Sequence, residues 1–141
     1  MHKAGPIIVI EDDEEDQEIL QEIFNKLNYP NKVLFFSESD KALEYISDPN
    51  HNPFLILSDL NMPKTDGLTL RNKIFADKQL QAKCIPYLFF TTGTHQKAVI
   101  DAYGTSVQGF FIKPSNLTAL ENTLRKIIEY WQESFSPNHY N

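Results

Sequence analysis

Short hydrophobic runs alternate along the chain with segments in which hydrophobic residues recur at helical spacing. Five such runs predict buried strands, at residues 6–10, 32–36, 54–58, 87–90 and 110–112. Helices are predicted at residues 41–46, 68–75, 96–103 and 116–131, and one more lies between the first run and the stop at Asn28-Tyr29-Pro30. Five repeats of strand and helix predict an α/β fold with a parallel sheet wrapped by helices.

Two of these helices carry long hydrophobic stripes, which we expect to face the core. The stripe of the first helix comprises Ile19, Leu20, Ile23, Phe24 and Leu27. The stripe of the last helix comprises Leu117, Leu120, Leu124, Ile127, Ile128 and Trp131.

The size of the chain favours a single domain, since 141 residues with 41% hydrophobic content bury one core well. We expect this domain to span residues 1–135. Residues 136–141 are polar and contain a proline, which is typical of a short flexible tail. No output domain is expected.

The net charge of −6 is local, because seven acids fall between Glu11 and Glu18 and the remainder is nearly balanced. Without a basic stripe, nucleic-acid binding is not expected. Cys84 is the only cysteine, so an internal disulfide and a cysteine-rich metal cluster are excluded. No signal peptide or membrane-length apolar stretch is found, and we expect a soluble, cytoplasmic protein that does not bind membranes.

Polar groups follow four of the predicted strands directly. They are the acidic pair Glu11 and Asp12, then Asp59, Thr91 and Lys113. Ligands of open α/β sheets bind at the carboxyl ends of the strands, so these side chains are expected to converge on one edge. The sequence therefore predicts a site there.

The loop after the first strand indicates the kind of ligand. It contains acids where a nucleotide-binding fold would have glycines, so it would repel bare phosphate. Magnesium prefers carboxylate oxygens and also bridges to phosphate, which makes magnesium with a phosphoryl group the expected ligand pair. Residues 13–16 are more simply explained as acids that offset the dipole of the first helix.

Asp59 begins the segment Asp59-Leu60-Asn61-Met62-Pro63-Lys64-Thr65-Asp66-Gly67, in which Gly67 predicts a positive-φ turn before the next helix. An aspartate that faces an acidic pair, a threonine hydroxyl and a lysine has what a carboxylate nucleophile needs to accept a phosphoryl group. Lys113 and the metal would neutralise phosphoryl oxygens, and Thr91 would donate a hydrogen bond.

At these positions the sequence resembles the receiver domain of two-component response regulators, over residues 7–131. The acidic pair, the Asp-x-x-Met-Pro-x-x-Asp-Gly loop, the threonine and the Lys-Pro pair occur in the family's order. The resemblance implies a doubly wound, flavodoxin-like (βα)5 fold with strand order 2-1-3-4-5. It also implies Mg²⁺ bound by Asp12, Asp59 and the Asn61 carbonyl, with Glu11 acting through water.

The resemblance further implies a phosphoryl donor, a histidine kinase or a histidine phosphotransfer protein, and Asp59 as the acceptor. The domain would catalyse only its own phosphorylation and dephosphorylation. Thr91 and Phe110 would be switch residues that reshape the face of the fourth helix, fifth strand and fifth helix, where an unknown protein target binds. A cis Lys113–Pro114 bond is expected. The chain departs from the family pattern at Phe110, Thr92 and Ser106.

Two other classes of protein are weaker alternatives. A pseudo-receiver would bind proteins without being phosphorylated, but the complete set of site residues argues against it. A haloacid-dehalogenase-type phosphatase needs a second acid two residues after its nucleophile, and Asn61 cannot protonate a leaving group. Within the receiver class, roles as relay, phosphate sink or effector stay open, as does a homodimer.

Overall fold

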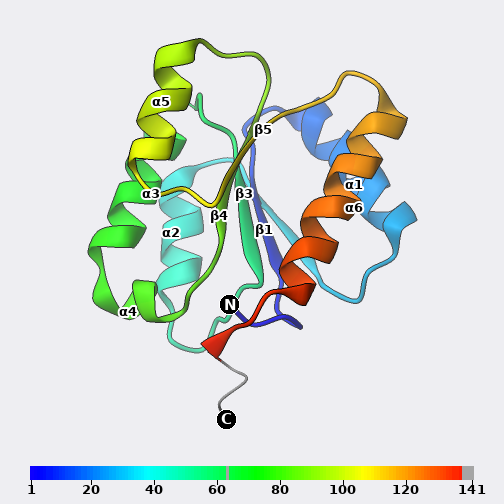
Figure 1. The fold of residues 1–141 in the computed structure, drawn as a ribbon. Helices are drawn as coiled ribbons and strands as arrows, with labels where there is room; N and C mark the ends of the chain where they lie inside the picture. Colours follow the sequence, from blue (N-terminus) through cyan, green and yellow to red (C-terminus); the bar gives the residue numbers. More distant parts are fainter. Residues whose placement is uncertain (63, 138–141) are drawn as a thin grey trace.

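The computed structural model describes residues 1–62 and 64–137, and a five-stranded parallel sheet forms its centre (Figure 1). The strands are β1 (Ile7–Ile10), β2 (Val33–Phe36), β3 (Leu55–Ser58), β4 (Tyr87–Thr91) and β5 (Gly109–Ile112). Their order is β2-β1-β3-β4-β5, with all neighbours parallel. The doubly wound α/β fold and the strand order predicted above are both confirmed.

Helices cover both faces of the sheet. They are α1 (Glu14–Leu27), α2 (Ser39–Ser47), α3 (Gly67–Ala76), α4 (Lys78–Ala82), α5 (Gln96–Gly104) and α6 (Leu117–Glu133). Figure 1 shows α1 and α6 on one face and α2, α3, α4 and α5 on the other. The predicted fourth and fifth helices are thus α5 and α6, and α4 is additional. This helix is five residues long and buries only Leu80, so it has no hydrophobic periodicity to detect.

Two hydrophobic clusters hold the layers together, one on each face of the sheet. Alternate β1 residues divide between them, since Ile7 and Val9 face α1 and α6 whereas Ile8 and Ile10 face the other layer. The central strands β1, β3 and β4 are buried along their full length. This is the pattern expected of a parallel sheet covered on both faces.

Two residues of the predicted stripes do not reach the core. Ile19 is 37% exposed and Leu117 is 59% exposed. Both lie near the start of their helices, where they line a shallow hollow beside Lys113 and Pro114 rather than the sheet face. The rest of each stripe is buried or packs against the core cluster. The predicted stripes were therefore wrong at their first positions.

The structure describes residues 136 and 137 of the predicted tail but not residues 138–141. Ser136 is buried, and Pro137 lines a hollow at the amino-terminal edge of the sheet. The flexible tail therefore remains a prediction for residues outside the described part.

Candidate functional site

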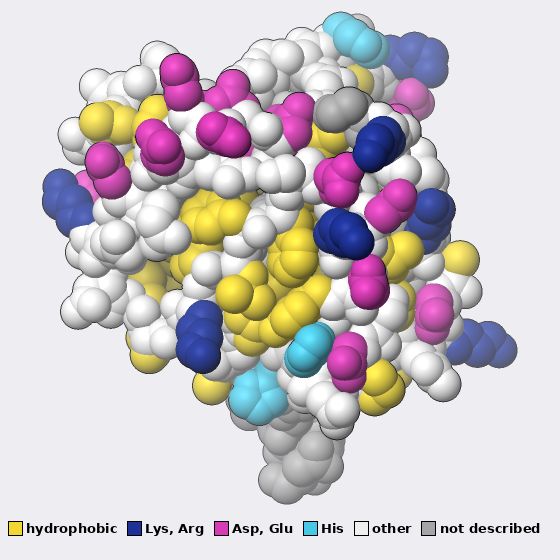
Figure 2. All heavy atoms as spheres, turned by 180° about the vertical axis from the view of Figure 1, so that it is seen from behind, with side chains coloured by type: hydrophobic (Ala, Val, Ile, Leu, Met, Phe, Trp, Pro, Cys, Tyr) yellow, Lys and Arg dark blue, Asp and Glu magenta, His cyan; other side chains and the backbone are white. Residues whose placement is uncertain are grey.

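The acidic side of the site is built where β1 ends and α1 begins. Glu11 is buried, and its carboxylate accepts a hydrogen bond from the Asp13 backbone N–H at 3.0 Å. Asp13 is the N-cap of α1, with its carboxylate accepting from the N–H groups of Glu15 and Asp16. The dipole-offsetting role predicted for residues 13–16 thus fits Asp13. Figure 2 shows acidic side chains gathered along the same edge of the molecule.

Asp59 follows β3 directly and is 8% exposed. Its Oδ1 accepts hydrogen bonds from the Thr91 hydroxyl at 2.6 Å and from the Asn61 backbone N–H at 3.2 Å. Thr91 lies at the end of β4 and is fully buried. The carboxylate is therefore held in a defined orientation, and its Oδ2 takes part in none of these hydrogen bonds.

Gly67 stands behind Asp59 and allows a close approach of two backbones. A Cβ at this position would lie 2.3 Å from the Asp59 carbonyl oxygen and 2.9 Å from the Ser58 hydroxyl oxygen. The positive-φ turn predicted at Gly67 was wrong, because Gly67 is the first residue of α3 and the loop turns at Lys64, whose φ is 66°. The glycine is needed for space rather than for its backbone angle.

Lys113 brings a buried ammonium to the acids from the far edge of the sheet. Its Nζ pairs with the Glu11 carboxylate and lies 3.3 Å from Asp16 and 3.9 Å from Asp59. Its backbone N–H donates to the Thr91 carbonyl at 2.7 Å, which positions the residue at the end of β5. The sequence did not identify Asp16, although its place one helical turn after Asp12 and Asp13 puts it on the side of α1 that faces the site.

The cis Lys113–Pro114 bond expected from the family resemblance is not found. No peptide bond within residues 1–62 and 64–137 is cis, so this bond is trans. Trans is also the intrinsically favoured isomer before proline. Lys113 nevertheless reaches the site, because its backbone N–H donates to the Thr91 carbonyl and its ammonium pairs with Glu11.

The site contains more acidic than basic side chains, and burial and neighbouring charges change the pKa values of Glu11 and Lys113. Burial is the main cause that raises the pKa of Glu11 to about 7, against the opposing effect of the ion pair with Lys113. Burial alone would lower the pKa of Lys113, but the hydrogen bond from its ammonium to Glu11 and the charges of the surrounding carboxylates raise it. One ammonium does not neutralise this cluster.

A divalent metal fits the donor set. Carboxylate oxygens of Glu11, Asp12 and Asp59 lie within 4.8 Å of one another. Hard oxygen donors at this separation, with Asp12 exposed to solvent, suit a cation that retains several waters. The approach of Asp12 to Asp59 that the sequence predicted is confirmed.

Three further predicted positions are Phe110 on β5, Thr92 after β4, and Ser106, which precedes β5 at the opposite end of the sheet. Phe110 is half-buried and packs against Phe89 with ring centroids 5.7 Å apart. Thr92 is exposed beside Lys113. Ser106, which replaces a usual glycine of the family, has a φ of 60° and so keeps the left-handed conformation that glycine favours.

The sequence matches the family model of the response regulator receiver domain over residues 7–125. The chain therefore belongs to the response regulator receiver family. Members of this family are signalling modules that interact with histidine kinases and downstream targets, and they bind divalent metal ions.

The helices of the described residues include none with the length and hydropathy of a membrane span.

Individual relatives agree with this assignment. The response regulator Rcp1 of Synechocystis is 27% identical over 91% of this chain and 89% of its own length. The chemotaxis protein CheY-3 of Vibrio cholerae is 27% identical over 92% of this chain and 95% of its own. Crystal structures of the phosphorylated cyanobacterial phytochrome response regulator RcpA and of Mn²⁺-bound Rcp1 superpose with TM-scores of 0.82 and 0.79. Each is 26% identical and covers 94% of this chain, and the match covers 98% and 97% of the two structures' chains.

Proposed function

We propose that this protein is a single-domain response regulator that accepts a phosphoryl group on Asp59. The observation that carries the proposal is the surroundings of that carboxylate. The Thr91 hydroxyl is 2.6 Å from Oδ1, the Lys113 ammonium is 3.9 Å from Oδ2, and two other acids complete a group of metal donors. A carboxylate placed only to cap a helix would need none of these neighbours.

In this mechanism Oδ2 of Asp59 attacks the phosphorus of a phosphohistidine on a kinase or phosphotransfer protein. The P–N bond breaks and its electron pair stays on the imidazole, while Asp59 becomes an acyl phosphate. Lys113 neutralises a phosphoryl oxygen, and the Thr91 hydroxyl hydrogen-bonds to another. Mg²⁺ bound by Asp12, Asp59 and the Asn61 carbonyl, with Glu11 through water, would supply further charge neutralisation.

The signal would be read from the face formed by α5, β5 and α6. A shift of Thr91 toward the phosphoryl group vacates space beside β4, and Phe110 turns inward to fill it. Because Phe110 has no hydroxyl, this movement depends on packing against residues such as Phe89 rather than on a new hydrogen bond. The reshaped face would bind a downstream protein or a second copy of the chain. The cytoplasmic location remains a prediction.

Intact-protein mass spectrometry after incubation with acetyl phosphate tests this function. We expect the wild type to gain one phosphoryl group that requires magnesium and is removed by hydroxylamine, whereas Asp59→Asn gains none. Asp66→Asn is a matched control, because the Asp66 carboxylate caps α3 by accepting from the Thr69 N–H, and asparagine keeps an oxygen that can do the same. A wild type that stays unmodified with every acyl-phosphate donor would instead support a pseudo-receiver.

A further inference from the structure

Apart from the site around Asp59, the structure has a cavity at the amino-terminal ends of the strands, on the opposite edge of the sheet. Its volume is about 440 Å³. Ile74, Leu80, Tyr87, Trp131 and Phe135 contribute much of its apolar lining. Ligand cavities in proteins begin at about 300 Å³, so the space suits a small organic molecule.

A buried cation lines this cavity. Arg71 is only 3% exposed, and its Nη2 donates one hydrogen bond, to the Ser106 carbonyl at 3.2 Å. Its Nε has no hydrogen-bond partner, and no carboxylate in the described part of the chain pairs with it. Its guanidinium lies 4.5 Å from the centroid of the Phe75 ring, which is a contact with an aromatic face and not with an anion. A buried guanidinium with an unused donor is costly unless an anion joins it.

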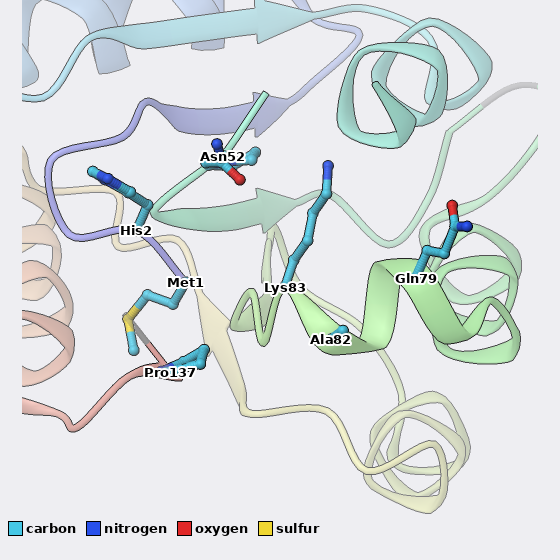
Figure 3. A pocket seen from close by; sticks show the side chains of 8 residues that line it. Met1, His2, Asn52, Gln79, Ala82, Lys83 and Pro137 are labelled. Carbon is cyan, nitrogen blue, oxygen red and sulfur yellow. The ribbon is translucent and has the colours of Figure 1, made fainter. Parts of the chain in front are cut away.

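Lys83, a cation near this cavity, has its hydrogen bonds satisfied. Lys83 Nζ donates to the carbonyls of Ile46, Asp48 and His51, each at 2.7 to 2.8 Å. Figure 3 shows its side chain extended from α4, away from Met1 and Pro137 in the adjoining hollow. An ammonium with three acceptors has no donor left, so Lys83 does not compete with Arg71 for an anion.

We propose that this cavity binds a small carboxylate with an apolar body. The carboxylate pairs with the Arg71 guanidinium, which lines the cavity, and the hydrocarbon part fills the space between α3, α4 and the end of α6. Guanidinium and carboxylate groups form strong, charge-assisted hydrogen bonds, and the apolar lining favours the body over a hydrated ion. The site is independent of Asp59 and of its phosphorylation.

The Arg Nε–H signals of the ¹⁵N-labelled wild type provide a direct test, since Arg71 and Arg125 are the only arginines. The probes are 4-phenylbutyrate and its neutral amide, 4-phenylbutyramide. We expect the acid to shift the Arg71 Nε–H signal downfield in a saturable manner. The amide should bind at least about tenfold more weakly than the acid. The Arg125 signal should not move.

Variants give a second measurement. Arg71→Met should weaken binding of the acid about tenfold, whereas Arg125→Met should not, because Arg125 lies on α6 and pairs with Glu121 at 3.4 Å. Should Arg71→Met not fold, the wild-type shift decides alone. Equal binding of acid and amide, binding of neither, or shifts that map away from the cavity would each overturn the proposal.

Discussion

Replacing Asp12 by asparagine tests whether Glu11, Asp12 and Asp59 act as a metal site. At 4.8 Å, the upper limit of their separation, two unit charges interact with about 1 kcal/mol in water and about 3.5 kcal/mol at an effective dielectric constant of 20. Asp12 is exposed and faces two carboxylates, but Glu11 is paired with Lys113 and has a raised pKa, so the lower figure applies about once, to the repulsion between Asp12 and Asp59. The variant should therefore be about 1 kcal/mol more stable than the wild type in EDTA, a rise in Tm of roughly 2–5 °C.

Magnesium should reverse this order. At one hundred times the dissociation constant, bound metal stabilises the wild type by about 2.7 kcal/mol, and Asp12→Asn should lose most of that gain. Calorimetric melting with EDTA and with a magnesium series measures both effects. Glu22→Gln is the matched control, because it removes the same charge from the exposed surface of α1 outside the carboxylate group. The reasoning is refuted if Asp12→Asn melts no higher than the wild type in EDTA, or if magnesium stabilises both proteins equally.

Three further substitutions test separate features. Since the pKa of Glu11 is raised to about 7, the folded state binds its proton more tightly than the unfolded state, so metal-free stability should fall as pH rises from about 4.5 to 7. Glu11→Gln should flatten this slope in melts across pH, and an unchanged slope would contradict it. Gly67→Ala places a Cβ 2.3 Å from the Asp59 carbonyl oxygen and should cost about 2–3 kcal/mol in urea unfolding and slow labelling by acetyl phosphate; wild-type values would exclude the clash. Ser106→Gly relieves a left-handed φ of 60° and should stabilise the fold by about 0.5–1 kcal/mol, seen as a higher urea midpoint, whereas a lower midpoint would mean that Ser106 is not strained.

The sequence predicted the fold and the main residues of the site, but not all the contacts within the site. Buried parallel strands are continuous hydrophobic runs, and their carboxyl ends share one edge, so Asp59, Thr91 and Lys113 could be brought together without coordinates. Contacts that depend on backbone spacing were not predictable in this way. Gly67 served for close approach instead of a turn, and such an approach leaves no periodic pattern. Asp16 was missed although helical spacing places it on the side of α1 that faces the site, because acids in a first helical turn are also explained by the helix dipole.

Helix ends were the other weak point. Ile19 and Leu117 fit the hydrophobic stripes by spacing, yet both line the hollow beside Lys113 and Pro114 and stay exposed. Periodicity reports which side of a helix a residue occupies but not whether a neighbouring element extends far enough to bury it. The short helix α4 escaped notice for a related reason, since a single buried residue has no period.

The ion pair between Glu11 and Lys113 joins residues 102 positions apart, across the ends of the intervening strands β3 and β4. During synthesis, the acids and Asp59 leave the ribosome well before the lysine that partly neutralises them. A contact of such long range forms late, because most of the chain must be ordered first. An unfinished chain thus presents Asp59 without its ammonium partner, so the site that we propose for phosphorylation is completed only when the fold is.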